Sequence, residues 1–143
     1  MTHAYASAEL TAGAYLRKRR EAARLTIRDV AKVITGLPDG DAGTTDLMLV
    51  LDLVEGGNLP CPPELLDNLG HAIRFVPEIY AALLAGTGVP PICRDCACSW
   101  TDPCVHSDGE ACAWAQPDLC TACAVTSGAP APVRARPPLR VVA

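Results

Sequence analysis

The sequence predicts a mainly α-helical protein that continues into a small cysteine-rich module stabilised by metal and then into a disordered tail. Apolar residues recur at helical spacing up to about residue 86. Seven of the eight cysteines then fall within residues 93–123. The chain has only six aromatic residues, so we expect its core to consist mainly of Leu, Val, Ile and Ala.

Changes in composition divide the chain into five expected segments. They are a flexible arm (1–10), a helical domain (11–86), a linker (87–91), a cysteine-rich zinc-binding module (92–124) and a disordered Pro/Arg tail (125–143). Neither a signal peptide nor a run long enough to span a bilayer is present in the sequence. We therefore expect a cytoplasmic protein without a membrane partner. Cysteines that cluster in a reducing compartment favour metal ligation over disulfides.

Charge is distributed unevenly along the chain. Residues 1–37 carry a net charge of +4, residues 38–123 carry −11 and residues 124–143 carry +3. A generally basic surface, such as many DNA-binding proteins have, is therefore absent. Any contacts with phosphate must come from the start of the chain or from the tail.

The first two predicted helices have clear start signals. The first begins near Thr11, and the second begins after Thr26, which is an N-cap with Asp29 in the capping-box position. The inward face of the second helix is formed by Ile27, Val30, Ala31 and Ile34.

Three further helices follow a loop that is dense in Gly, Pro and Asp at residues 35–45. The third helix, DLMLVLDLVE, is capped by Thr44 or Thr45 and stopped by two glycines. The fourth follows Pro62-Pro63, and the fifth begins at Pro77. The inward side chains expected on the fifth helix are Ile79, Tyr80, Leu83 and Leu84.

The stretches LRKRREAARLTIRDVA and VEGGN, with the leucine-bearing fourth helix, resemble the Cro/repressor (XRE) helix-turn-helix family over roughly residues 11–86. The resemblance implies a five-helix DNA-binding domain. It also implies a structural salt bridge between Arg20 and Glu55, which matches an arginine–glutamate pair common in that family. The alternative is that both are solvated surface charges. Because the pair would be partly buried, the loss of either partner would be costly.

The sequence departs from the family's pattern at two places. The loop at 35–45 adds roughly ten residues between the second and third helices. The positions that read bases in the family correspond to Met48, Leu49 and Leu53, whose side chains cannot make the hydrogen bonds that read base edges. An exposed apolar face of this kind indicates contact with a protein partner or a homodimer. Burial beneath the long loop is an equally supported alternative.

Basic residues form a stripe on the first two helices. The candidates for nucleic-acid binding are Arg17, Lys18, Arg24, Arg28 and Lys32. Their contacts with DNA phosphates would be independent of sequence and strongly dependent on salt. A solvated helix face is the competing interpretation of the stripe.

The cysteine-rich module follows the pattern C-x2-C-x-C-x5-C-x7-C-x7-C-x2-C. Its outer pairs, Cys93/Cys96 and Cys120/Cys123, each place two thiols on one tight turn. Two such turns supply the four soft ligands of a tetrahedral zinc site.

The inner cysteines suggest a second site. Cys98, Cys104 and Cys112 lack one ligand for a tetrahedral ion, and His106 is the expected fourth. The sequence therefore predicts one or two zinc ions, with an iron–sulfur cluster as the runner-up. We expect Trp100 and Trp114 to pack over the sulfur atoms. The W-x3-DLC-x2-C ending is similar to small metal-binding modules of phage and prophage proteins.

The residue patterns favour a regulatory protein over an enzyme. A Gly-rich phosphate loop, a Ser/His/Asp order and a carboxylate pair in a plausible cleft are all missing from the sequence. We expect a phage-like or bacterial transcriptional regulator with a DNA-binding-type helical domain and a structural zinc module. The alternative is a protein-interaction adaptor that uses the apolar face of the third helix.

Overall fold

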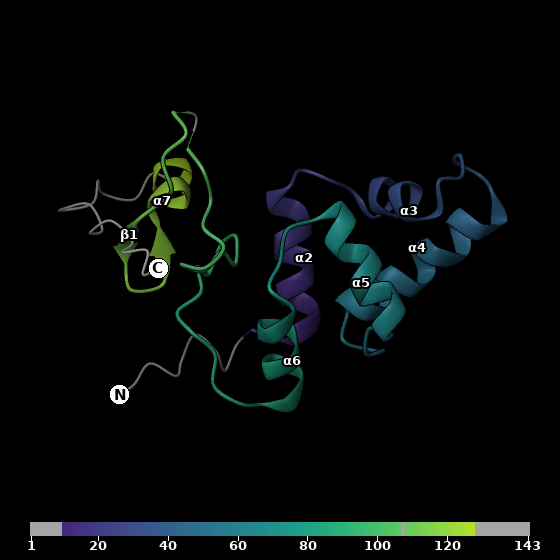
Figure 1. The fold of residues 1–143 in the computed structure, drawn as a ribbon, viewed down its shortest axis with the longest axis horizontal. Helices are drawn as coiled ribbons and strands as arrows, with labels where there is room; N and C mark the ends of the chain where they lie inside the picture. Colours follow the sequence, from purple (N-terminus) through teal and green to yellow (C-terminus); the bar gives the residue numbers. More distant parts are fainter. Residues whose placement is uncertain (1–9, 107, 128–143) are drawn as a thin grey trace. The chain divides into compact units, whose positions relative to one another are not determined.

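The computed structural model describes residues 10–106 and 108–127, and the chain divides into two compact units between Val89 and Pro90. The described chain is mainly helical, with a small cysteine-rich region near its C-terminal end (Figure 1). This agrees with the mainly helical fold and the small cysteine-rich region predicted from the sequence.

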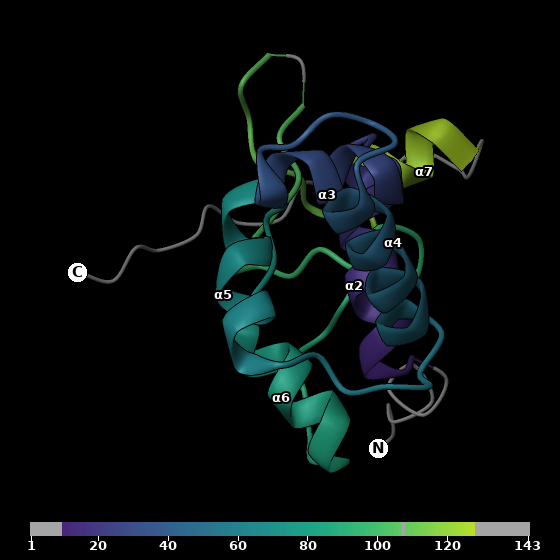
Figure 2. The same ribbon diagram turned by 90° about the vertical axis from the view of Figure 1, so that its right-hand side faces the viewer.

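In its described residues, the first unit contains the helices α2 (Ala12–Ala22), α3 (Ile27–Thr35), α4 (Ala42–Glu55), α5 (Pro63–Ala72) and α6 (Pro77–Ala85). Helix α2 packs against α4 and α6, and α3 packs against α4 and α5. Figure 2 shows α3 and α4 on one side of the unit, with α5 continuing into α6.

The core of the helical unit consists mainly of aliphatic side chains and two tyrosines. It includes Tyr15, Leu16, Val30, Ala31, Leu51, Val54, Leu65, Leu69, Ile79 and Tyr80. Both tyrosine hydroxyls accept hydrogen bonds from backbone N–H groups near helix starts: Tyr15 accepts from Val76, and Tyr80 accepts from Cys61, both at 2.9 Å. Because α5 and α6 begin with proline and have no side-chain cap, these hydroxyls satisfy donors that the core would otherwise leave unpaired.

The capping box expected at the start of α3 is confirmed. The Asp29 N–H donates to the Thr26 hydroxyl, and the Thr26 N–H donates to the Asp29 carboxylate. These bonds with Thr26 hold the pKa of Asp29 below its usual value.

The expected start of the third helix is wrong by one turn. Helix α4 begins at Ala42 and is capped by Asp41, whose carboxylate accepts from the Gly43 N–H at 2.9 Å. Thr44 is buried instead, and its hydroxyl donates to the Leu37 carbonyl at 3.4 Å. The aspartate cap shortens the connection, so part of the expected loop is helical.

Helix α6 also differs from expectation at one position. Ile79 and Tyr80 are buried as predicted, but Leu84 is 55 % exposed. Helix α6 ends at Ala85, and the next residue, Gly86, has the left-handed conformation.

The second unit contains a short hairpin of β1 (Trp114–Gln116) and β2 (Leu119–Cys120), followed directly by α7 (Thr121–Ser127). Because α7 extends to Ser127, the first residues assigned to a disordered tail are helical. The rest of that tail and the expected arm at 1–9 lie outside the described residues.

Within residues 10–106 and 108–127, none of the helices has the length and apolar character needed to cross a bilayer.

Candidate metal centre and interaction face

The first cysteine pair lies on a tight turn closed by backbone hydrogen bonds. The Ala97 N–H donates to the Cys93 carbonyl at 2.8 Å, and the Cys93 N–H donates to the Cys98 carbonyl at 2.9 Å. Ala97 has a φ of 64°, which lies in the left-handed region that non-glycine residues adopt only at a cost. Closing the turn this way places Cys93, Cys96 and Cys98 close together.

The second pair is positioned by the junction of β2 and α7. Cys120 ends the strand, and Cys123 follows in the first turn of the helix. Thr121 fixes this junction because its N–H donates to the Ala113 carbonyl at 2.8 Å and its hydroxyl accepts from the Ala113 N–H at 2.9 Å.

Polar contacts tie the two cysteine turns together. The Arg94 N–H donates to the Asp118 carbonyl at 2.8 Å, and the Arg94 side chain forms an ion pair with the Asp118 carboxylate. Two backbone N–H groups also donate to sulfur: Cys98 to Cys96 at 3.4 Å, and Cys120 to Cys93 at 3.5 Å. Donors of this kind stabilise thiolate, which is the form that binds metal.

The four thiols of the two outer turns converge. The sulfur atoms of Cys93, Cys96, Cys120 and Cys123 all lie within 4.8 Å of one another, and this group could hold a metal ion. Three of the four residues are buried. Four clustered, shielded sulfur ligands are typical of closed, structural metal sites.

The inner cysteines join the same cluster rather than forming a separate one. A second group whose sulfur atoms lie within 4.8 Å of one another consists of Cys96, Cys98, Cys104 and Cys120. Cys96 lies 3.4 Å from Cys104, and Cys112 lies 3.8 Å from Cys98. All seven cysteines of this unit are free thiols, and their cluster forms the centre of its buried core.

His106 is placed differently from the sequence prediction. Its Nε2 atom lies 3.0 Å from the Thr121 hydroxyl, and neither four-thiol group includes it. The reason is the hairpin-like closure of the loop between Cys104 and Cys112. The His106 N–H donates to the Glu110 carbonyl, and the Cys112 N–H donates to the Cys104 carbonyl, both at 2.8 Å.

The thiols strongly influence one another's protonation. A hydrogen bond from Cys112 is the main reason that the pKa of Cys104 lies below its usual value. Cys104 in turn raises the pKa of Cys96 and of Cys98. Cys120 opposes ionisation of Cys93, but hydrogen bonds from Cys96 and Cys98 lower the pKa of Cys93 to about 5. Because the thiolates would repel one another, a bound cation is needed for all of them to ionise together.

The remaining aromatic and cysteine residues have simpler surroundings. Trp114 packs against the thiol cluster as expected, whereas Trp100 is 52 % exposed and does not cover it. Cys61 is buried in the helical unit, and desolvation raises the pKa of its thiol to about 11. Such a thiol is inert at neutral pH.

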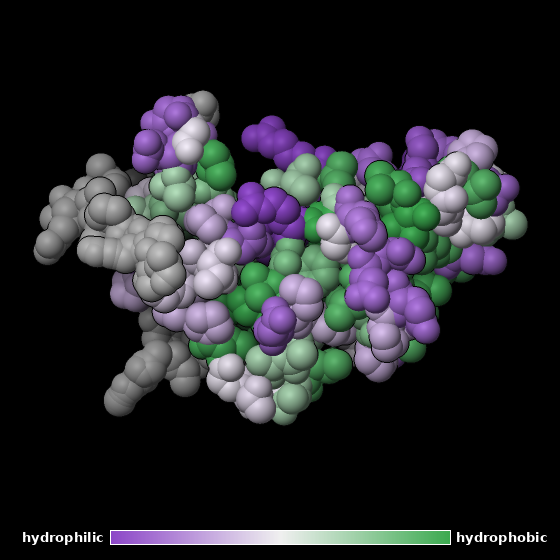
Figure 3. All heavy atoms as spheres, in the orientation of Figure 1, coloured by the Kyte–Doolittle hydropathy of each residue, from purple (hydrophilic) through white to green (hydrophobic). Residues whose placement is uncertain are grey.

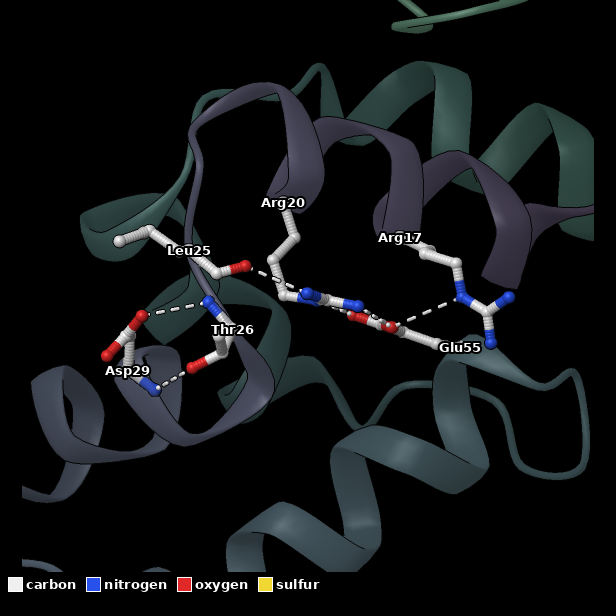
Figure 4. A network of polar contacts seen from close by, with 6 residues as sticks. All are labelled: Arg17, Arg20, Leu25, Thr26, Asp29 and Glu55. Atoms are coloured by element: carbon white, nitrogen blue, oxygen red, sulfur yellow. Dashed lines mark hydrogen bonds and ion pairs between the residues drawn. The ribbon is translucent and has the colours of Figure 1, made fainter.

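In the helical unit, the expected pair of Arg20 and Glu55 is present (Figure 4). Arg20 Nε donates to Glu55 Oε2 at 2.7 Å, and Nη2 donates to Oε1 at 2.8 Å. A third donor, Nη1, bonds the Leu25 carbonyl at 2.8 Å. The bonds to Glu55 raise the pKa of Arg20. One guanidinium therefore joins α2, the following turn and the end of α4.

Several cations of the basic stripe already have acidic partners. Arg17 lies 3.6 Å from Glu55, while Arg28 and Lys32 lie 3.7 and 3.6 Å from Asp39. Within the described part of the chain, Lys18 and Arg24 have no acidic partner. The positive charge available on this stripe is therefore smaller than the sequence suggests.

The apolar residues of α4 are exposed. Leu49 is 61 % and Leu53 is 43 % exposed, while Met48 is half-buried. The loop before α4 contacts the start of that helix through Leu37, so it does not bury these two leucines. Figure 3 shows apolar residues exposed among polar ones on the displayed face of the helical unit.

The sequence reasoning missed the sharing of thiols between the outer and inner groups. The signal that could have revealed it is the count of seven cysteines, which is one fewer than two separate four-thiol sites require.

Comparisons of the chain with protein-family models, with curated proteins and with solved structures give no match.

Proposed function

We propose that this chain is a small regulatory protein that contacts another protein through α4 and whose cysteine-rich unit is folded by zinc. The observation that carries the protein contact is the exposure of Leu49 and Leu53 on one side of α4. Covering two such side chains stabilises a complex by roughly 1.5–3 kcal/mol each. Neither side chain carries a hydrogen-bonding group that could read a base edge.

Charge indicates the chemistry of the partner. Helix α4 contains no Lys or Arg, and the exposed Asp46 and Asp52 lie beside the two leucines. In a pairing of two copies through α4, these carboxylates would meet and repel one another. The partner we infer is a segment of another protein with apolar residues flanked by Arg or Lys. Its apolar residues would cover the two leucines, and its basic residues would pair with the two carboxylates.

Photo-crosslinking from position 49 tests this assignment. A benzoylphenylalanine in place of Leu49 should join the chain to a protein segment of that composition, whereas the same group at exposed Ala81 should not. A synthetic peptide of the captured segment should then bind the wild-type chain. A second copy of the chain, or DNA, as the joined molecule would overturn the assignment.

Matched variants sharpen the test. Leu49→Gln/Leu53→Gln should weaken peptide binding by at least about tenfold, or about 1.4 kcal/mol, while the thermal midpoint stays unchanged because both side chains are exposed. Asp46→Asn/Asp52→Asn should weaken binding less and reduce its salt dependence. Unchanged affinity in both variants would contradict a contact through this face.

Zinc is proposed because of the donor set. Four clustered thiols, three of them buried, suit a structural zinc ion, which has no geometric demand beyond a tetrahedron. Metal analysis of the purified chain should find zinc. A brown protein that contains iron and acid-labile sulfide would replace zinc with an iron–sulfur cluster, and a chain without metal would contradict this part of the proposal.

A second candidate function is transcriptional regulation by DNA binding, as in a phage-like or bacterial repressor. It is supported by the packing of α3 against α4, by the ion pair of Arg20 with Glu55, and by the lack of an acidic partner for Lys18 and Arg24 among the described residues. Gel shifts with genomic fragments at several salt concentrations test it. Binding that weakens steeply with salt and is lost in Lys18→Gln/Arg24→Gln would favour this function over the protein contact.

A further inference from the structure

We propose that the cysteine-rich unit binds two zinc ions and that the sulfur of Cys120 is a ligand of both. This inference rests on the proposed zinc binding and specifies its architecture. Its starting point is the overlap of the two four-thiol groups, which have Cys96 and Cys120 in common. Two ions can occupy overlapping groups only if at least one sulfur bridges them.

The number of thiols favours one bridge. Two tetrahedral ions need eight ligands when they share none, seven when they share one and six when they share two. The unit contains seven cysteines, all of them in the cluster. One shared sulfur uses every thiol, whereas two shared sulfurs would leave one buried thiol without an ion.

Neighbour relations identify the shared sulfur. The Cys112 sulfur lies 3.8 Å from the Cys98 sulfur, and Cys104 and Cys120 are further thiols close enough to raise the pKa of Cys112. The first ion therefore takes the first four-thiol group, Cys93, Cys96, Cys120 and Cys123. For the second ion we infer the second group with Cys112 in place of Cys96, that is Cys98, Cys104, Cys112 and Cys120. With Cys96 assigned to the first ion alone, Cys120 is the one member common to both sets.

Two sulfur spacings within the proposed sets fit this assignment. Four sulfur atoms about 2.3 Å from a tetrahedral ion lie about 3.8 Å apart. Cys96 and Cys120, both in the first set, are 3.9 Å apart, and Cys98 and Cys112, both in the second set, are 3.8 Å apart. Cysteines joined by a disulfide would be far closer, at about 2.05 Å.

The shared sulfur also has an electrostatic advantage. Two ions that share a thiolate carry less net negative charge than two separate four-thiolate sites, so mutual repulsion is smaller. The N–H groups of Cys98 and Cys120 donate to sulfur within the same cluster. On binding, each thiol loses its S–H proton to solvent and forms one S–Zn bond, or two in the case of Cys120, and no atom changes its oxidation state.

Cadmium NMR of the intact chain tests the bridge directly. When zinc is replaced by an NMR-active cadmium isotope, two cadmium signals are expected. The β-protons of Cys120 should correlate with both signals, and those of every other cysteine in the unit with one. Correlation of Cys96 with both signals, or of Cys120 with only one, would overturn the inference while leaving metal binding intact.

Metal stoichiometry by native mass spectrometry separates failure of the inference from failure of the proposed function. The wild-type chain should carry two zinc ions. A single ion would overturn the shared-sulfur inference alone, and a chain without zinc would overturn the proposed function as well.

Single substitutions give an independent check on the two sets. Cys123→Ala should lose the first ion and keep the second, and Cys112→Ala should do the reverse. Cys120→Ala should disturb both ions. Cys61→Ala is the matched control because this cysteine lies in the other unit, and it should keep both ions. Loss of the same ion in Cys123→Ala and Cys112→Ala would contradict the assignment.

Discussion

The helical unit buries leucines, valines and two tyrosines, whereas the cysteine-rich unit buries mainly sulfur. The core of the first includes Leu16, Leu51 and Leu69, and the core of the second consists of cysteines with Leu119 and Ala124. Burial of aliphatic surface suffices to fold a domain of the first kind. A module as small as the second has too little apolar surface and needs an additional source of stability.

The two tryptophans make this difference measurable. Trp100 and Trp114 both lie in the cysteine-rich unit, so tryptophan fluorescence reports on that unit alone. Most of the helical residues lie in the other unit, so far-UV circular dichroism reports mainly on it. One sample therefore gives a separate signal for each unit.

The largest expected effect is the loss of a metal ligand. Structural zinc contributes on the order of 10–16 kcal/mol to the folding of small modules. We expect Cys120→Ala, which disturbs both ions, to unfold the cysteine-rich unit, seen as a shift of tryptophan fluorescence, and to leave the helical signal nearly unchanged. Cooperative loss of both signals would show that the units do not fold separately.

The next largest effect is expected at the ion pair of the helical unit. The Glu55 side chain is only 5 % exposed and lies at the end of α4, where the helix dipole disfavours negative charge. Glu55→Ala removes the partner of the part-buried Arg20, so we expect a loss of about 3–5 kcal/mol in urea unfolding. Arg17→Ala is the control, with a loss of at most about 1 kcal/mol, because this contact is longer and half-exposed. Equal losses in both variants would contradict this ranking.

A smaller effect is expected where α2 approaches α4. A Cβ atom on Gly13 would lie 2.4 Å from the Val54 carbonyl oxygen and 2.7 Å from that of Glu55. Gly13→Ala should therefore destabilise the helical unit by about 1–3 kcal/mol. Gly70→Ala in α5 has open space around it and should stabilise the unit by about 0.5–1 kcal/mol. Stabilisation by both substitutions would mean that α2 and α4 lie farther apart.

The smallest expected effect concerns helix caps. Thr26→Ala should cost about 1 kcal/mol, because the Asp29 N–H loses its acceptor. Thr45→Ala should change stability by less than about 0.5 kcal/mol, since Asp41 caps α4. Thermal melts of the two variants compare the caps. A larger loss of stability for Thr45→Ala than for Thr26→Ala would support the start of the third helix that was expected from the sequence.

Local features of the helical unit could be predicted from the sequence. The capping box needs only Thr26 and Asp29 three residues apart, and the Arg20–Glu55 pair followed from the positions of these residues in a resembling family. The start of α4 could not be predicted this way. Asp41 and Thr44 are both good caps, and tertiary burial of Thr44 decides between them.

The clustering of the cysteines could be predicted from the sequence, and their grouping could not. Spacing identifies cysteine pairs that lie on one turn, but it does not say how separate turns meet. The hairpin-like loop from Cys104 to Cys112 returns both thiols to the cluster, while His106 bonds to Thr121. Only the folded backbone shows that the inner and outer thiols share neighbours.

Hydrogen exchange of the full chain, with zinc and after chelation, tests the difference between the units most directly. We expect chelation to abolish amide protection between residues 93 and 123 while the protection of α2 and α4 is unchanged. If the amides of the cysteine-rich unit stay protected without metal, zinc does not fold that unit, and this account of the chain is contradicted.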